Sequence, residues 1–178
     1  MGISNALAGG IMLIAMVYVI LGIPGLLEGN ATMSGALVQR SSADDETLKT
    51  SIDITALSLV AGNTVINVDL ANDGTTKQWE YSKFTVIATY DANVTGSRVR
   101  TTEQLSYGGI SSSPAAGQWV MYSFDPSTDS YVDPQVVNPG EQFVIRIRPQ
   151  NAIYETNPSV HVAVSTPNGV VASMGGTF

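Results

Sequence analysis

An uncharged, mostly apolar run opens the chain, and it gives way to a pattern in which apolar and polar residues alternate. Residues 1–27 contain no Asp, Glu, Lys, Arg or His, and the first formal charge is Glu28. A helix needs about 20 apolar residues to cross the hydrocarbon layer of a membrane. Residues 6–27 supply 22 positions. We therefore predict a hydrophobic α-helix over residues 1–27 that lies in a membrane or in an apolar bundle of copies of itself.

Two features of this run bear on its structure. A secretory signal peptide would carry basic residues ahead of a shorter apolar stretch. No Lys or Arg precedes this run, so cleavage near Gly29 is the alternative rather than the main prediction.

Pro24 predicts a kink or a helix end near residue 22, because proline removes a backbone donor and clashes with the preceding turn. Residues 28–50 are predicted to form a partly helical stalk.

From residue 51 onward, apolar residues recur at every second position, as in strands with one buried face. The alternation changes phase between Ile54 and Leu57, which predicts a bulge. The segment Pro167-Asn168-Gly169 is a hairpin signal between the last two strands. The predicted strands cover residues 52–59, 66–70, 79–90, 98–107, 118–124, 131–137, 142–148, 160–165 and 170–173.

These eight or nine short strands are separated by clusters of Gly, Pro, Asn and Ser. Such a pattern predicts an all-β antiparallel sandwich of immunoglobulin-like type over residues 51–178. Residues 108–117 are predicted as an exposed loop, since they are rich in Gly and Ser. The fold class is therefore an antiparallel β-sandwich preceded by a long N-terminal hydrophobic α-helix.

Composition narrows the class of function. Eight basic residues against fifteen acidic ones give a net charge of −7. Phosphate binding needs a clustered basic surface, so we expect no nucleic-acid partner. The chain has no Cys, which removes disulfides, thiol catalysis and Cys-based zinc sites together.

Candidate catalytic residues are scarce. The single histidine, His161, lies between Val160 and Val162 in a predicted strand, so alternation places it on the outer face. A second His or a Cys would be needed for a Cys-His pair or a His-based zinc site. No G-x-S-x-G turn occurs. We predict no catalytic, cofactor-binding or metal-binding residues and no enzymatic activity.

Two sets of charged residues have structural explanations. Asp125, Asp129 and Asp133 lack the spacing and the glycine of a calcium loop, and prolines follow two of them, so turns explain them. Arg146 and Arg148 are predicted on the strand face opposite Phe143, Ile145 and Ile147. They form a solvated stripe, or alternatively a contact surface.

Contacts between helices are predicted in the first part of the chain. Small residues let helix backbones approach closely, and nearly every face of the predicted helix is apolar. The residues that we expect at a packing face are Gly9, Gly10, Ile14, Val17 and Leu21.

Surface modification is predicted at two sequons. The triplet N-A-T begins at Asn30, and N-V-T begins at Asn93. Glycosylation requires that the β-domain lie outside the cell, which depends on the orientation of the chain in the membrane. A short N-terminal tail stays inside most easily while the large polar part is translocated. The β-domain is therefore predicted to face outward.

Several segments carry a resemblance to a known family. The chain resembles an archaeal member of the type IV pilin superfamily, and its start resembles the F/G accessory proteins of the archaellum, the archaeal flagellum. The segments that carry the resemblance are Met1-Gly2-Ile3-Ser4, Val68-Asp69-Leu70-Ala71-Asn72-Asp73-Gly74, Phe84-Thr85-Val86, Asn138-Pro139-Gly140-Glu141 and Ser165-Thr166-Pro167-Asn168-Gly169-Val170.

This resemblance implies a structural part of a motility apparatus. It implies a stator-like protein at the cell surface, a single-pass membrane protein whose sandwich binds a cell-envelope partner such as a surface-layer protein. The alternative is a pilin or archaellin subunit of an extracellular filament, in which the helices of many copies form the core. No Lys/Arg-Gly processing site precedes the helix, which favours the stator-like reading. A mature end at Met1 would favour the filament subunit and contacts with other archaellum or pilus subunits.

Overall fold

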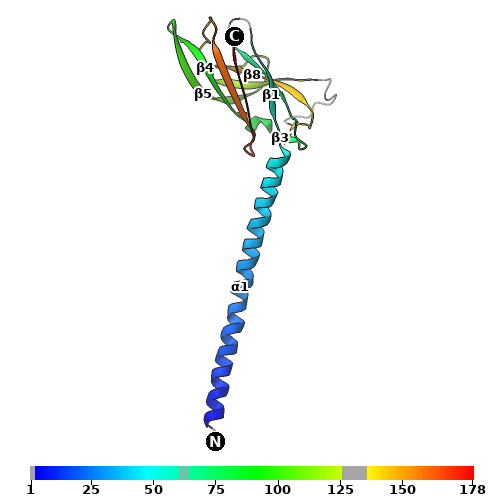
Figure 1. Ribbon diagram of the computed structural model, residues 1–178, viewed down its shortest axis with the longest axis vertical. Coiled ribbons are helices and arrows are strands. Elements are labelled where there is room, and N and C mark those ends of the chain that lie inside the picture. The colour runs from blue at the N-terminus through cyan, green and yellow to red at the C-terminus, as the bar shows by residue number, and fades with distance from the viewer. Residues whose placement is uncertain (1–2, 61, 63, 126–135) are drawn as a thin grey trace. The chain divides into compact units, whose positions relative to one another are not determined.

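The structure is a computed structural model that describes residues 3–60, 62, 64–125 and 136–178. Side chains of residues 4–6, 22–27 and 30 fall outside the description. The chain divides into two compact units, Met1–Asp45 and Glu46–Phe178 (Figure 1). Each unit is described by itself below.

A single long helix accounts for the first unit. The helix α1 (Ile3–Lys49) has 47 residues, and only its last four, from Glu46, belong to the second unit. Its backbone stays helical through Pro24, so the predicted helix end near residue 22 is wrong. Proline removes one backbone hydrogen-bond donor, and the backbone hydrogen bonds of the turns before and after Pro24 keep the long helix continuous. Among the described residues, no helix has a stretch that is both long and apolar enough to cross a membrane.

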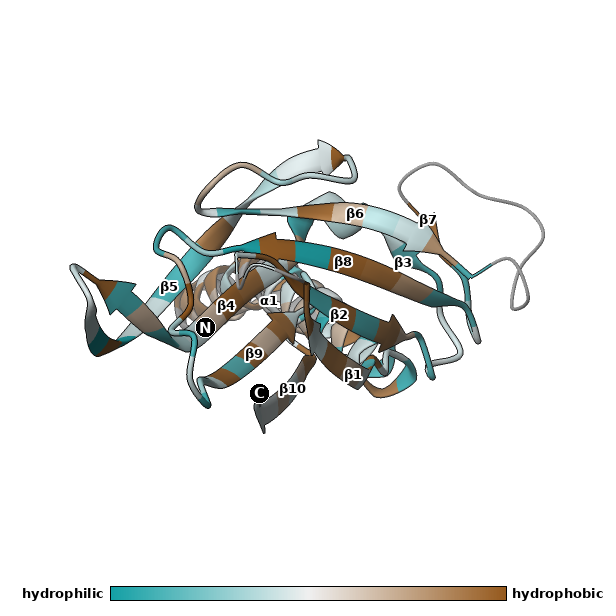
Figure 2. Cartoon of the chain, turned by 90° about the horizontal axis from the view of Figure 1, so that it is seen from above, coloured by the Kyte–Doolittle hydropathy of each residue, from teal (hydrophilic) through white to brown (hydrophobic). Residues whose placement is uncertain are grey.

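The second unit is a β-sandwich built from one rolled sheet. Eight of its described strands lie in the order β1-β2-β8-β6-β5-β4-β9-β10, and β3 and β7 form a separate pair. The edge strands β1 and β10 contact each other, so the sheet folds back on itself (Figure 2). The strands are β1 (Asp53–Leu59), β2 (Ile66–Ala71), β3 (Gln78–Trp79), β4 (Thr85–Val94), β5 (Ser97–Ile110), β6 (Gln118–Phe124), β7 (Val136–Val137), β8 (Gln142–Arg148), β9 (Ser159–Ser165) and β10 (Val171–Thr177).

One long strand joins the two layers of the sandwich. The first part of β5 pairs antiparallel with β4, from Ser97 to Leu105. From Ser106 onward β5 pairs with β6, and this pairing is parallel. A strand that changes partner in this way makes a corner between layers. The predicted sandwich is confirmed, and its purely antiparallel character is corrected at this one pair.

Alternating side chains from both layers fill the core. Phe84, Val86, Ala88 and Tyr90 share the inner face of one segment, as predicted, and all are buried. The phase change in β1 is also confirmed, because the register with β2 shifts between Ile54 and Ala56. Other fully buried large side chains are Tyr81, Trp119, Met121, Phe143, Ile145 and Ile147.

Two predicted boundaries need correction. The strand predicted over residues 79–90 is broken by a 3₁₀ turn, η1 (Tyr81–Lys83). Glu80 adopts a left-handed conformation with φ 55°, which turns the chain and places Tyr81 in the core. The loop predicted over residues 108–117 begins later, because β5 extends to Ile110. Most of the strand predicted over residues 131–137 lies outside the described residues.

Candidate functional site

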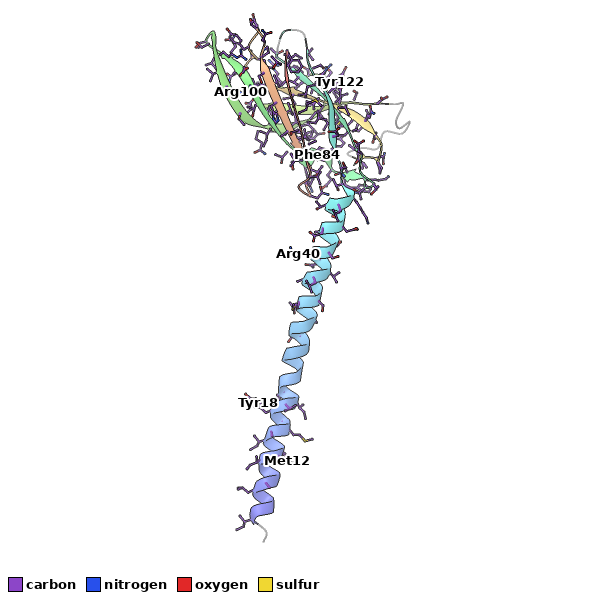
Figure 3. The ribbon with its side chains drawn as sticks, in the orientation of Figure 1. Met12, Tyr18, Arg40, Phe84, Arg100 and Tyr122 are labelled. Atoms are coloured by element: carbon purple, nitrogen blue, oxygen red, sulfur yellow. The ribbon has the colours of Figure 1, made fainter. Side chains whose placement is uncertain are left out.

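The residues predicted to pack between helices all lie on α1. A Cβ added to Gly9 or Gly10 would meet no atom within 4 Å. The predicted packing residues Ile14, Val17 and Leu21 are exposed by 69%, 45% and 73%. Figure 3 shows side chains such as Met12 and Tyr18 projecting outward from the helix. Within the unit Met1–Asp45 this apolar surface has no intramolecular partner among the described residues, and its packing role stays a prediction.

The two predicted sequons differ in setting. Asn93 is the penultimate residue of β4, beside a two-residue hairpin turn in which Thr95 and Gly96 have φ values of 50° and 85°. Its Oδ1 atom accepts a hydrogen bond from the Gly96 N–H at 3.0 Å. Asn30 lies in α1, and its side chain falls outside the described residues. Glycosylation at either site stays a prediction.

The hairpin of β4 and β5 carries a buried carboxylate that the sequence patterns did not reveal. Asp91 is only 5% exposed. Its carboxylate accepts hydrogen bonds from Arg98, from Arg100 at 3.1 Å and from the Ser159 N–H at 2.8 Å. The same arginines donate to backbone carbonyls, Arg98 to Asn157 at 3.0 Å and Arg100 to Ser159 at 2.9 Å. This cluster ties the hairpin to the segment that enters β9.

The charge state of Asp91 follows from these contacts. Burial alone would raise the pKa of its carboxyl, since a charged group is less stable away from water. The Ser159 N–H and the two guanidinium groups outweigh burial and lower the pKa to about 2. Asp91 is therefore an anion at neutral pH and acts as a structural ion partner. One signal in the sequence could have revealed it, because a tight turn at Thr95-Gly96 places Asp91 opposite Arg100 in an antiparallel hairpin.

The arginine stripe on β8 has a defined structure. Arg146 lies opposite the buried Ile145 and Ile147, as predicted, and its guanidinium carbon lies 3.5 Å from the centroid of the Tyr122 ring. It also donates from Nε to the Asn67 side chain at 3.0 Å. Arginine stacks well on aromatic faces. The stacked pair covers part of the outer face of β6 and β8.

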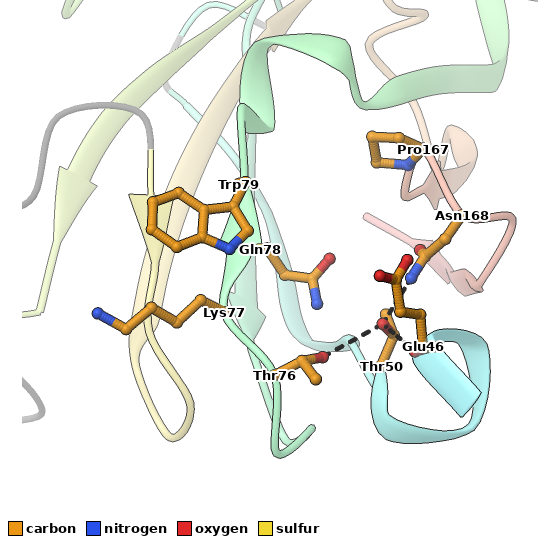
Figure 4. Close-up of a pocket in the computed structure, with 8 residues that line it drawn as sticks. All are labelled: Glu46, Thr50, Thr76, Lys77, Gln78, Trp79, Pro167 and Asn168. Carbon is orange, nitrogen blue, oxygen red and sulfur yellow. Dashed lines mark hydrogen bonds between the residues drawn. The ribbon is translucent and has the colours of Figure 1, made fainter. Parts of the chain in front are cut away.

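A pocket lined by both polar and apolar groups lies at the end of the sandwich where α1 ends. It has a volume of about 350 Å³, and all its lining residues belong to the unit Glu46–Phe178 (Figure 4). The lining residues are Glu46, Thr50, Thr76, Lys77, Gln78, Trp79, Pro167 and Asn168.

Hydrogen bonds fix one wall of the pocket. Thr50 donates from its hydroxyl to the carbonyl of Glu46 at 2.8 Å and accepts from the Asn168 amide at 2.6 Å. Thr76 donates to the carbonyl of Lys49 at 3.2 Å. The final helical turn, the loop before β3 and the hairpin before β10 are thereby joined. The sequence pattern predicted the hairpin at residues 167–169, but it did not predict that this hairpin lies next to residues 46–50 and 76–79.

The opposite wall is formed by β3. Gln78 pairs with Val137 of β7, and the residue as a whole is only 5% exposed. Its amide has no hydrogen-bond partner among the described residues. Trp79, the next residue, is 65% exposed, and the Lys77 ammonium lies 5.9 Å from its ring centroid. Figure 4 shows the Gln78 amide between Trp79 on one side and Glu46 and Asn168 on the other.

The remaining titratable residues form no reactive constellation in the described part of the chain. His161 is exposed on the face of β9 opposite Val160 and Val162, as predicted. In residues 3–60, 62, 64–125 and 136–178, no three His, Asp or Glu side chains gather as metal ligands would. Asp125 directly follows β6, whereas Asp129 and Asp133 lie outside the described residues.

Comparison with known sequences identifies one family. The chain matches the conserved flagellar protein F, immunoglobulin-like domain, over residues 48–174. No curated protein sequence matches it significantly.

Comparison with solved structures extends the likeness to the fold. The archaellum periplasmic stator protein complex FlaF and FlaG from Sulfolobus acidocaldarius is 17% identical with a TM-score of 0.50, over 70% of this chain and 87% of that chain. The archaellum periplasmic stator protein FlaG from the same organism is 18% identical with a TM-score of 0.50, over 71% and 99%. The archaeal flagellum of Methanospirillum hungatei strain JF1 is 15% identical with a TM-score of 0.58, over 97% and 92%. At these identities the likeness is one of fold.

Proposed function

The chain belongs to the conserved flagellar protein F family through its immunoglobulin-like domain, and on this premise we propose that it is a stator-like structural component of an archaellum, without enzymatic activity. The family match across most of the β-sandwich is the observation that carries the proposal. In this role the N-terminal helix anchors the protein in the membrane. The sandwich lies outside and binds a cell-envelope protein such as one of the surface layer.

The exposed surface of α1 supports an anchoring role. Each large apolar side chain gains about 1.5–3 kcal/mol when it leaves water. From Leu7 to Leu21, eleven large apolar side chains of the described residues are at least 45% exposed. A helix with such a surface is unfavourable in water, so it requires either lipid or other helices around it.

A second candidate uses the same helix in a filament. The fold likeness to the Methanospirillum hungatei flagellum extends over 97% of this chain, which includes both the helix and the sandwich. Gly9 and Gly10 leave open space beside the helix for a close neighbour. In this alternative the helices of many copies pack into a core, and the sandwiches coat it.

The anchoring role is tested by fractionation and capture. Cells that express the full chain or a chain without residues 1–27 are separated into membrane and soluble fractions. We expect the full chain in the membrane fraction, from which it should capture an envelope or motor protein after mild crosslinking, and the truncated chain in the soluble fraction. Recovery of the truncated chain in the membrane fraction would show that another segment anchors the protein.

A further inference from the structure

We propose that the pocket between β3 and the hairpin before β10 binds a neutral saccharide unit. The assignment is independent of the role of the protein in an archaellum, because it depends only on residues 46–50, 76–79 and 167–168. Four observations carry it: an amide that a largely buried glutamine turns to the pocket, a mixed set of donors and acceptors, an exposed indole and the balance of charge.

The amide of Gln78 points to a ligand. Backbone pairing with Val137 holds its strand in place, and the residue as a whole is only 5% exposed. In the described residues, the side-chain groups fully cut off from water without a partner are the Tyr81 hydroxyl and the Trp119 indole N–H, so the Gln78 amide still meets the water that fills the pocket. A ligand that displaces this water must replace its hydrogen bonds. Among the described residues this amide has no partner, and it faces the pocket (Figure 4). A ligand that both donates and accepts would satisfy it.

Neighbouring groups extend this hydrogen-bonding capacity. Glu46 presents a carboxylate that accepts, and the Thr76 hydroxyl, whose proton is donated to the Lys49 carbonyl, presents an oxygen that accepts. Sugar hydroxyls also donate and accept, so vicinal hydroxyls can bridge an amide and a carboxylate at once.

Trp79 supplies the apolar complement. Its indole is 65% exposed, whereas the other tryptophan, Trp119, is completely buried in the core. An indole combines a large apolar face with one polar N–H group. The C–H face of a pyranose ring is flat and weakly polar, and it can pack on such a surface while the hydroxyl groups at its rim meet Gln78.

Charge and size limit the ligand. The lining contains one anion, Glu46, and one cation, Lys77, so it favours no net charge on the ligand. The volume of about 350 Å³ falls in the range of small-molecule sites. A single sugar unit, or the end of a glycan, fits these properties.

The test is calorimetric titration of the full-length chain with methyl glycosides of glucose, galactose, mannose and N-acetylglucosamine. The protein is kept in an amine-oxide detergent, because alkyl glucosides and maltosides would compete for the site. We expect saturable binding of at least one glycoside. Trp79→Ala should weaken it by about tenfold or more, and Trp79→Phe should retain most of it. Gln104→Ala, an exposed change on β5, serves as the control and should bind as the native chain does.

A second variant separates binding from folding. Gln78→Leu keeps the buried volume but removes the amide, so it should melt at the native temperature or above and lose glycoside binding. A large fall in melting temperature would show that the amide has a structural partner and would overturn the proposal. So would the absence of binding for every glycoside, or equal binding by the native chain, Trp79→Ala and Gln78→Leu.

Discussion

Arg100 donates a hydrogen bond from Nη1 to Oδ1 of Asp91 at 3.1 Å, directly across the β4 and β5 pair. Arg98, two residues before Arg100, reaches the other oxygen of the same carboxylate. Both arginines are about half exposed, whereas Asp91 is buried. The carboxylate therefore acts as the anchor of the cluster, and the arginines shield it from water.

Removal of this anchor should destabilise the domain. Asp91→Asn keeps the shape of the side chain but leaves two guanidinium groups without their anion, so we expect the free energy of unfolding to fall by about 2 kcal/mol. Chemical denaturation followed by circular dichroism measures the change. Asp73→Asn, at an exposed position, is the matched control and should have little effect. Equal losses in the two variants would contradict the structural role of Asp91.

The ion pair between Asp91 and Arg100 predicts that the stability of the domain depends on pH. Because the pKa of Asp91 is lowered from 3.8 to about 2, the unfolded chain binds more protons than the folded chain between these values. The contribution of Asp91 to stability is therefore complete above about pH 4 and is lost as the pH falls through about 2. Denaturation of the native chain and Asp91→Asn across this range should show their difference shrinking with acidification. A difference that stays constant would exclude this titration.

Much of the sandwich was predictable because its strands alternate. The apolar positions Ile66, Val68 and Leu70 lie on one face of β2, and all three are buried. The break after Trp79 was missed, although the apolar phase changes between Tyr81 and Phe84. A left-handed residue such as Glu80 leaves little trace in a hydropathy pattern.

The buried polar residues could not be predicted from alternation. Asp91 and Gln78 are polar, so their patterns place them at the surface. Their burial depends on segments distant in sequence, residues 154–159 for Asp91 and residues 136–137 for Gln78. Long-range contacts of this kind are set by the fold as a whole. The parallel pairing of β5 and β6 has the same origin.

Gly74 should tolerate no side chain. A Cβ at this position would lie 2.6 Å from the Lys49 carbonyl oxygen and from the Ser51 nitrogen, both of them backbone atoms. We expect Gly74→Ala to destabilise the domain by about 1–3 kcal/mol, because the loop must move away from residues 49–51. Thermal melting followed at the β-sheet signal measures it. Gly35→Ala, in open space on α1, is the control, and an equally large effect there would contradict the steric explanation.

The sequon at Asn93 makes a prediction about modification. Its asparagine is partly buried beside a hairpin turn, on a domain that we expect outside the cell. Intact mass spectrometry of protein from the native host should show a glycan that Thr95→Gly removes. Glycine suits the left-handed conformation at residue 95, so this variant should keep the turn. Identical masses for both proteins, after correction for the substitution, would show that Asn93 is unmodified.

The glycines of α1 distinguish its two proposed environments. A Cβ at Gly9 or Gly10 meets no atom of the chain within 4 Å, so a loss of assembly in Gly9→Leu or Gly10→Leu reports on a neighbouring molecule. In a lipid-facing anchor we expect little effect on membrane retention or motility, since lipid accommodates added volume. Gly35→Leu is the matched control. Loss of filaments in the Gly9 and Gly10 variants alone would favour the filament subunit.

The stator-like role is tested most directly by the composition of the filaments. Filaments sheared from cells are examined by electron microscopy, and their subunits are identified by mass spectrometry, including the N-terminus of each. We predict that this chain is absent from the repeating unit and remains with the membrane fraction. Its detection as the repeating subunit, with its helix in the filament core, would contradict the stator-like role and establish the alternative.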